Sequence, residues 1–97
     1  MISVVPVKAY DKIGLGVKVE LPDSPPLLLV IADKGFVMCG FLNVDVAENL
    51  GIAAAVVSGV KSFEDMLNEK VKAATSKAKN LGVHMGMKGV DALKQMF

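Results

Sequence analysis

Cys39 is the first residue to consider as a chemical group, because it is the only cysteine in the chain. A thiol beside Gly40 becomes a nucleophile when a cation or a helix N-terminus lowers its pKa. His84, the only histidine, would be its general base, but no carboxylate near it in the sequence would orient the ring. Free cysteine is among the most buried residue types. We therefore expect Cys39 to lie in a core or an interface, and we assign no catalytic residue.

A group of sulfur and imidazole side chains has the softness that suits monovalent copper. Its members are Met38, Cys39, His84, Met85 and Met87. No CxxC, HxxxH or carboxylate-rich spacing accompanies them, and methionine ordinarily fills gaps in apolar cores. We expect neither a metal site nor a cofactor. Gly14-Leu15-Gly16 precedes an expected strand rather than a helix, so it predicts a bent strand and not a dinucleotide site.

The segment from Gly59 to Ser62 precedes an expected helix, where free amides, Lys61 and a hydroxyl would converge on a small anionic ligand. Helix capping alone also explains Ser62, so both interpretations stay open. The candidate ligand-binding residues are Cys39, Gly40, Asn43, Lys61 and Ser62.

Charge and composition argue against nucleic acid and membranes as partners. Eleven cations, all lysine, and ten acidic residues leave a net charge of +1, which gives no long-range attraction to polyanions. Without arginine the chain lacks the planar fork that reads phosphates and guanine, and aromatic residues make up only 5%. Six lysines gather in the last third, where a solvated face explains them: Lys70, Lys72, Lys77, Lys79, Lys88 and Lys94.

The chain is expected to be one cytoplasmic domain over residues 1–97. One cysteine permits no internal disulfide, which fits a reducing compartment. The first residues have no basic leader and no cleavage site of small residues. The longest apolar stretch, from Leu27 to Leu42, is interrupted by Asp33 and Lys34 and is shorter than the roughly 20 residues of a spanning helix.

The first half predicts strands. Alternation over Val17–Leu21 indicates a half-exposed strand, and Ile2–Ala9 is its antiparallel partner across a turn from Tyr10 to Gly14. After the proline-rich loop 22–26, Leu27–Ala32 and Phe36–Leu42 form a central hairpin around a turn at residues 33–35.

The second half predicts short helices and one more strand of small residues. Asn43 caps a helix over Val44–Leu50, and Ile52–Ser58 is the strand. Ser62 caps a helix that ends at Asn68, and Thr75 caps the next one. Residues 70–73 are a short extended segment, and the last helix begins at a poor cap, Lys88. The fold class is therefore α+β, with two layers and a mixed or mainly antiparallel sheet whose short helices pack mostly on one face.

Apolar excess predicts self-association. Hydrophobic residues make up 53% of the chain, and on the strand from Phe36 to Leu42 neither face is polar, so both must be covered. The few helices cover one face, and a second subunit would cover part of the other. A homo-oligomer, most simply a dimer, is expected.

Three segments carry a resemblance to a known family: KGFVMCGFLN at 34–43, GVKSFEDMLN at 59–68 and GMKGVDAL at 86–93. Ala54, Val56, Val57 and the TSKA at 75–78 extend it over nearly the whole chain. The sequence resembles the family called domain of unknown function 1805, small proteins of archaea and some bacteria. The resemblance implies a compact two-layer α+β fold and brings no established activity or ligand. Lys88 departs from the Thr or Ser expected at that cap.

Two functions follow as hypotheses. The first is a self-associating binding or interaction module without catalysis. The alternative is an enzyme with a site at the subunit boundary, built from Cys39 and neighbouring polar residues. Alkylation of the native thiol by iodoacetamide separates them, since a catalytic thiol reacts fast and a core thiol does not.

Overall fold

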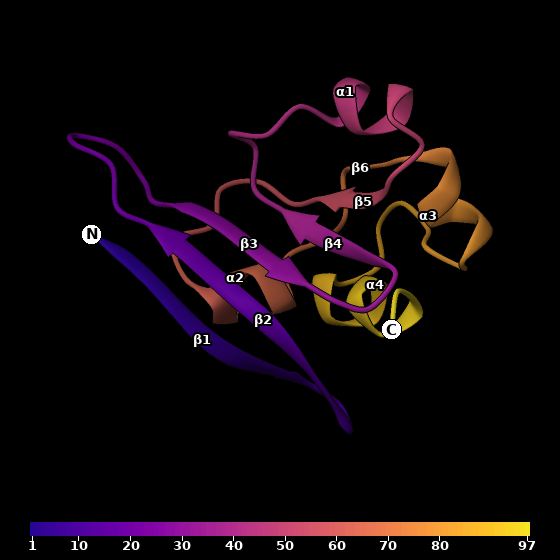
Figure 1. Ribbon diagram of the computed structural model, residues 1–97, viewed down its shortest axis with the longest axis horizontal. Helices are drawn as coiled ribbons and strands as arrows, with labels where there is room; N and C mark the ends of the chain where they lie inside the picture. The colour runs from indigo at the N-terminus through magenta and orange to yellow at the C-terminus, as the bar shows by residue number, and fades with distance from the viewer.

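One mixed sheet forms the framework of the computed structural model, which describes residues 1–97. Its six strands follow each other in the order of the sequence, and every neighbouring pair is antiparallel except β4 and β5, which are parallel. The strands are β1 (Ile2–Ala9), β2 (Lys12–Val19), β3 (Leu27–Ile31), β4 (Gly35–Met38), β5 (Ala53–Val56) and β6 (Ala73–Ala74) (Figure 1). The helices are α1 (Val44–Asn49), α2 (Phe63–Asn68), α3 (Ser76–Asn80) and α4 (Gly89–Gln95). This confirms the predicted α+β class.

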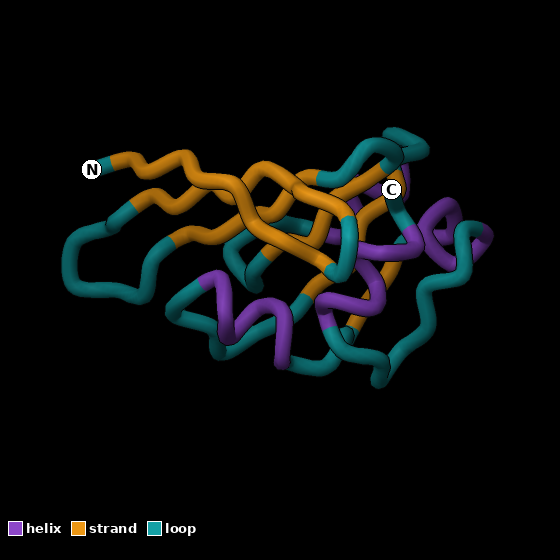
Figure 2. The backbone as a smooth tube through the Cα atoms, turned by 90° about the horizontal axis from the view of Figure 1, so that it is seen from below, coloured by secondary structure: helices purple, strands orange, loops and turns teal.

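The main core lies between the sheet and the helices that pack on one of its faces. Leu28, Val30 and Val37 point from the central strands into this core, where they meet Met66 of α2 and Leu93 of α4. Figure 2 shows the strands in one layer and most of the helical turns beneath them. Helix α1 is the exception, because its Ala47 packs in a smaller cluster on the opposite face, with Met38, Ala54 and Val56.

The first hairpin turns more tightly than predicted. Ala9 pairs with Lys12, so the turn consists of Tyr10 and Asp11 alone, and Tyr10 adopts a left-handed backbone with φ of 57°. The prediction that the turn extends to Gly14 is wrong, because Gly14 and Gly16 lie inside β2. A Cβ at Gly16 would come within 2.5 Å of Val7 Cγ2 and 2.9 Å of the Phe63 ring. Gly16 therefore lets α2 approach the sheet closely.

The central strand also ends earlier than predicted. β4 stops at Met38, and residues 39–42 form a turn in which the Leu42 N–H donates to the Cys39 carbonyl over 3.2 Å. Phe41, predicted on a covered sheet face, is instead 52% exposed. The chain must leave the sheet here because Asn43 starts α1, its Oδ1 accepting from the Asp45 N–H at 2.8 Å.

All three predicted polar caps are confirmed. Besides Asn43, the Ser62 Oγ accepts from the Asp65 N–H at 3.1 Å, and the Thr75 Oγ1 accepts from the Ala78 N–H at 3.3 Å. Lys88 makes no side-chain cap for α4. Such caps satisfy amides at helix starts that have no partner within the helix.

Tyr10 fastens the first hairpin to the last helix. Its hydroxyl donates to Asp91 Oδ1, and the Lys94 ammonium lies 5.0 Å from the centre of its ring. The hydrogen bond to Asp91, with smaller contributions from desolvation and from the negative charge of that carboxylate, raises the pKa of Tyr10 above its usual value.

Titration of Tyr10 is expected to show this contact directly. The chain has one tyrosine and no tryptophan, so ultraviolet absorbance of the phenolate reports Tyr10 alone. Its apparent pKa should exceed about 10, and Asp91→Asn should lower it towards that value because an amide accepts a weaker hydrogen bond from the hydroxyl and does not repel the phenolate. Since the folded pKa is raised, the stability from this contact is present below the unfolded pKa and disappears as pH rises through the folded one. Asp45→Asn on α1 is the control, and an ordinary wild-type pKa would contradict the assignment.

Candidate functional site

Two loops meet where the parallel strands β4 and β5 end. Residues 39–43 lead from β4 to α1, and residues 57–62 lead from β5 to α2. A Cβ at Gly40 would lie 3.8 Å from the Ser58 Cβ, which places the loops side by side. In open sheets with parallel strands, ligands bind outside the carboxyl ends of the strands. The fold therefore brings Cys39 and Gly40 to the same edge as the segment that carries Lys61 and Ser62.

A cleft of about 200 Å³ lies between these loops. The segment before β3 supplies its third wall, because β3 pairs with β4 and the Cys39 N–H donates to the Leu28 carbonyl at 3.1 Å. The walls are apolar side chains and glycine backbone. The residues that line it are Pro25, Pro26, Cys39, Gly40, Phe41, Gly59 and Val60. The sequence identified Pro25 and Pro26 only as loop residues. Their position beside Cys39 follows from the pairing of β3 with β4.

Cys39 sits at the bottom of this cleft and is nearly closed off from water. Its side chain is 4% exposed, and its Sγ accepts a hydrogen bond from the Leu28 N–H at 3.3 Å. The prediction that this thiol is buried is confirmed. His84 does not line the cleft. It is exposed on the loop between α3 and α4, where its backbone N–H donates to Met87 Sδ at 3.2 Å.

The start of α2 already uses the groups that were expected to hold an anion. The Lys61 N–H donates to Asp65 Oδ2 at 3.1 Å, and the Ser62 Oγ accepts from the Asp65 N–H. This reciprocal pattern resembles a capping box, with the Asp65 carboxylate accepting from the residue before the cap, and Glu64 and Asp65 add negative charge to the first turn. Capping thus explains Ser62. Lys61 borders a separate hollow of about 330 Å³ with Lys18, Glu20, Leu21, Ser24 and Pro26.

Asn43 borders two further hollows, one on each side of the segment that leads into α1. The first, of about 400 Å³, has Lys72 as its charged residue. The second is an apolar groove of about 260 Å³ between α1 and β4, which we call the α1 groove. It is lined by Phe36, Met38, Leu42, Asn43, Val46, Ala47, Leu50 and Ile52. Sequence reasoning missed this groove, because it arises from how α1 packs on the sheet.

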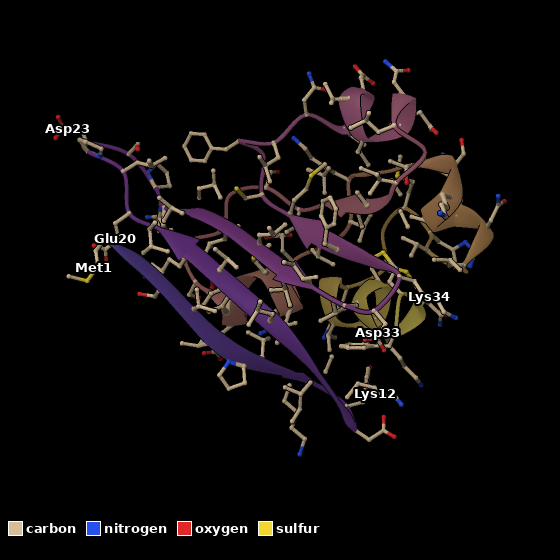
Figure 3. The ribbon with its side chains drawn as sticks, viewed as in Figure 1. Met1, Lys12, Glu20, Asp23, Asp33 and Lys34 are labelled. Atoms are coloured by element: carbon tan, nitrogen blue, oxygen red, sulfur yellow. The ribbon has the colours of Figure 1, made fainter.

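A broad apolar surface extends from the α1 groove across the uncovered face of β1, β2 and β3, which we call the bare sheet face. Register aligns its side chains: Leu15 pairs with Pro6 and Ile31, and Ile31 pairs with Phe36 of the groove. No helix lies over this part of the sheet in Figure 1. Figure 3 shows charged residues at the strand ends instead, with Glu20 and Asp23 at one end and Lys12, Asp33 and Lys34 at the other. The side chains of this face that are 36–68% exposed are Ile2, Val4, Ile13, Leu15 and Ile31.

No group of three or more histidine, cysteine, aspartate or glutamate side chains is arranged to hold a metal ion. None of the helices has the length and apolar character needed to pass through a bilayer.

Comparison with known proteins places this geometry among relatives without an assigned activity. A family model described as "Domain of unknown function (DUF1805)" matches residues 38–96. The chain is 30% identical over 100 residues to the uncharacterised protein YunC of Bacillus subtilis (strain 168), covering 99% of this chain and 98% of that protein. A crystal structure of TA1206 from Thermoplasma acidophilum, a protein of unknown function, superposes with a TM-score of 0.92 at 30% identity, covering 100% of this chain and 94% of that one.

Proposed function

Since the chain belongs to the DUF1805 family and its fold leaves one apolar sheet face uncovered, we propose that it is a self-associating binding module that forms a homodimer. The bare sheet face is the observation that carries this proposal. On β2 this face presents Ile13, Leu15 and Val17 in succession. An antiparallel sheet that faces water carries polar side chains there. A second copy of the chain would cover these side chains.

A stable dimer needs a larger apolar surface than a typical monomer exposes. The largest apolar patch on a typical monomer covers roughly 300–600 Å², while a stable interface buries about 800 Å² on each partner. The bare sheet face and the α1 groove together span β1 to β4 and the exposed flank of α1, where Val46 and Leu50 are 53% and 68% exposed. A two-fold dimer buries the same patch on both copies, so one apolar surface suffices.

Leu15→Glu is expected to convert the dimer to a folded monomer. Leu15 is 46% exposed in the single chain, so glutamate there remains hydrated in the monomer and would be buried in the dimer. Each dimer contains the change twice, so the dissociation constant should rise at least about 1,000-fold. Light scattering behind a sizing column measures the mass, and circular dichroism checks the fold.

Met85→Glu is the matched control, since Met85 is a similarly exposed apolar residue outside the bare sheet face and should leave the mass unchanged. A wild-type monomer at micromolar concentration, or a folded Leu15→Glu protein with the wild-type dimer mass, would refute the proposal.

A second candidate function is an enzyme or ligand-binding site in the cleft beside Cys39, completed at the subunit boundary. The observation that favours it is a free thiol in the wall of a cleft at the carboxyl ends of two parallel strands. The ligand class we propose is a small anion, because Lys61 directly follows the cleft residues Gly59 and Val60, although it borders the neighbouring hollow. A free thiol fits a reducing cytoplasm. Fast labelling of the native protein by iodoacetamide would support this function. Labelling only after unfolding would leave Cys39 as a core residue.

A further inference from the structure

We propose that the α1 groove receives the β1–β2 hairpin of a second copy, so that the two-fold axis of the dimer runs along the strands. The inference rests on the proposed homodimer and goes further by placing the partner. It assigns an occupant to a groove whose lining is apolar except for Asn43. The groove and the hairpin become the two halves of one self-complementary interface.

The groove is the continuation of the bare sheet face. Leu29 and Ile31 of β3 pair with Met38 and Phe36, which form the groove's floor. Its far wall is the flank of α1, which carries the exposed Val46 and Leu50. A partner that covers only β1 to β3 would leave this apolar wall in water at the rim of the interface. A partner whose edge reaches α1 would cover both.

Helix α1 also decides between the two ways of placing one sheet face on another. Packed sheets lie about 10 Å apart, and a helix with its side chains is itself about 10 Å thick. A two-fold axis perpendicular to the strands, in the plane between the two sheets, would stack α1 on the partner's α1. The two helices together would hold the bare sheet faces roughly two helix diameters apart. A two-fold axis parallel to the strands instead places the β1 edge of each sheet opposite the α1 side of the other. It places β1 and β2 of each copy over β4 of the other, beside α1, where no helix stands in the way.

The charges of the two halves match. Helix α1 contains Asp45 and Glu48 and no cation. The hairpin over residues 2–19 contains three lysines, but Lys12 pairs with the buried Ala9 and Lys18 with the buried Leu28, so both lie on the opposite face of the sheet. Lys8 shares the bare sheet face with Val4, because β-strand side chains alternate between faces. The acidic α1 beside Lys8 of the partner favours this arrangement, whereas α1 beside α1 would bring like charges together.

Chemical cross-linking of engineered thiols tests the placement. One variant carries Val46→Cys on the groove wall, and a second carries Val4→Cys on the bare sheet face. The two proteins are mixed in equal amounts, allowed to exchange subunits and treated with a short bis-maleimide. Wild type is the blank, since its only thiol is buried. The mixed product between positions 46 and 4 should exceed both products between like positions several-fold.

Each alternative outcome has a distinct meaning. A dominant product between two copies of the Val46→Cys variant would place α1 on α1 and overturn the inference. No cross-link between 46 and 4, in a mixture that light scattering shows to be dimeric, would also overturn it while the proposed homodimer stands. A monomeric wild type would remove the proposed function itself.

Discussion

Replacing Gly89 with alanine is expected to remove about 4 kcal/mol or more of the free energy of unfolding. Gly89 begins α4 and rests directly on the last turn of α2. Its N–H donates to the Glu69 carbonyl at 2.8 Å, and a Cβ would overlap the carbonyl oxygen of Met66. That oxygen belongs to backbone and cannot rotate away as a side chain would. The helix must shift as a whole, which separates Leu93 and Met96 from the main core.

Urea unfolding followed by circular dichroism, at one fixed protein concentration, measures this loss. Gly40→Ala is the matched control, because the nearest heavy atom to its Cβ would be Ser58 Cβ at an ordinary 3.8 Å. It should change stability by no more than about 0.5 kcal/mol. Equal losses for the two variants would show that α4 does not rest on α2 as described.

Thr75→Val is expected to be the next most damaging change, with a loss of about 3 kcal/mol. Thr75 is 1% exposed and is the polar residue among the buried side chains. Its Oγ1 accepts from the Ala54 N–H at 3.0 Å and donates to the Ile52 carbonyl at 2.7 Å, besides capping α3. Valine keeps the shape of the side chain but leaves these buried groups without this partner, at about 1–3 kcal/mol for each group left unpaired.

Thr75→Ser provides the comparison, because serine keeps the oxygen and loses only a methyl group, worth about 1 kcal/mol. Thermal or urea unfolding of the two variants should rank valine well below serine. The reverse order would mean that the methyl group, and not the hydroxyl, holds β5 to α3.

Features that depend on a few neighbouring residues could be predicted from the sequence. The caps at Asn43, Ser62 and Thr75 were found because a cap acts over two or three positions. Alternation of side chains along part of β2 predicted the first hairpin, and the glycine turn before Phe36 predicted the second. The family resemblance agreed with the α+β class.

Features that depend on distant partners could not be predicted. Gly14 was predicted at the end of a turn, and the close approach of Phe97 to Gly14 and of Phe63 to Gly16 had no signal in the sequence. The end of β4 at Met38 is set by where α1 must begin, and apolar alternation continues past that point. The cleft and the α1 groove form between segments far apart in the sequence, so their lining had no local signal. Cys39 and Gly40 were named as candidate ligand-binding residues because of their own types, and both line the cleft.

The strand order described above also sets the sequence of events as the chain is synthesised. Each new strand emerges next to the one it pairs with, so the sheet can grow outward from its first hairpin with little loop-closure entropy at each step. The hydrogen bond from Tyr10 to Asp91 cannot form until 81 more residues have been made. The Lys34 N–H likewise lacks its partner, the Met96 carbonyl, which lies 2.7 Å away in the finished fold. Until residues 89–97 have been made, the core face of the sheet lacks its cover from α4, including Leu93 and Met96. During that interval the nascent chain exposes the kind of surface that chaperones bind.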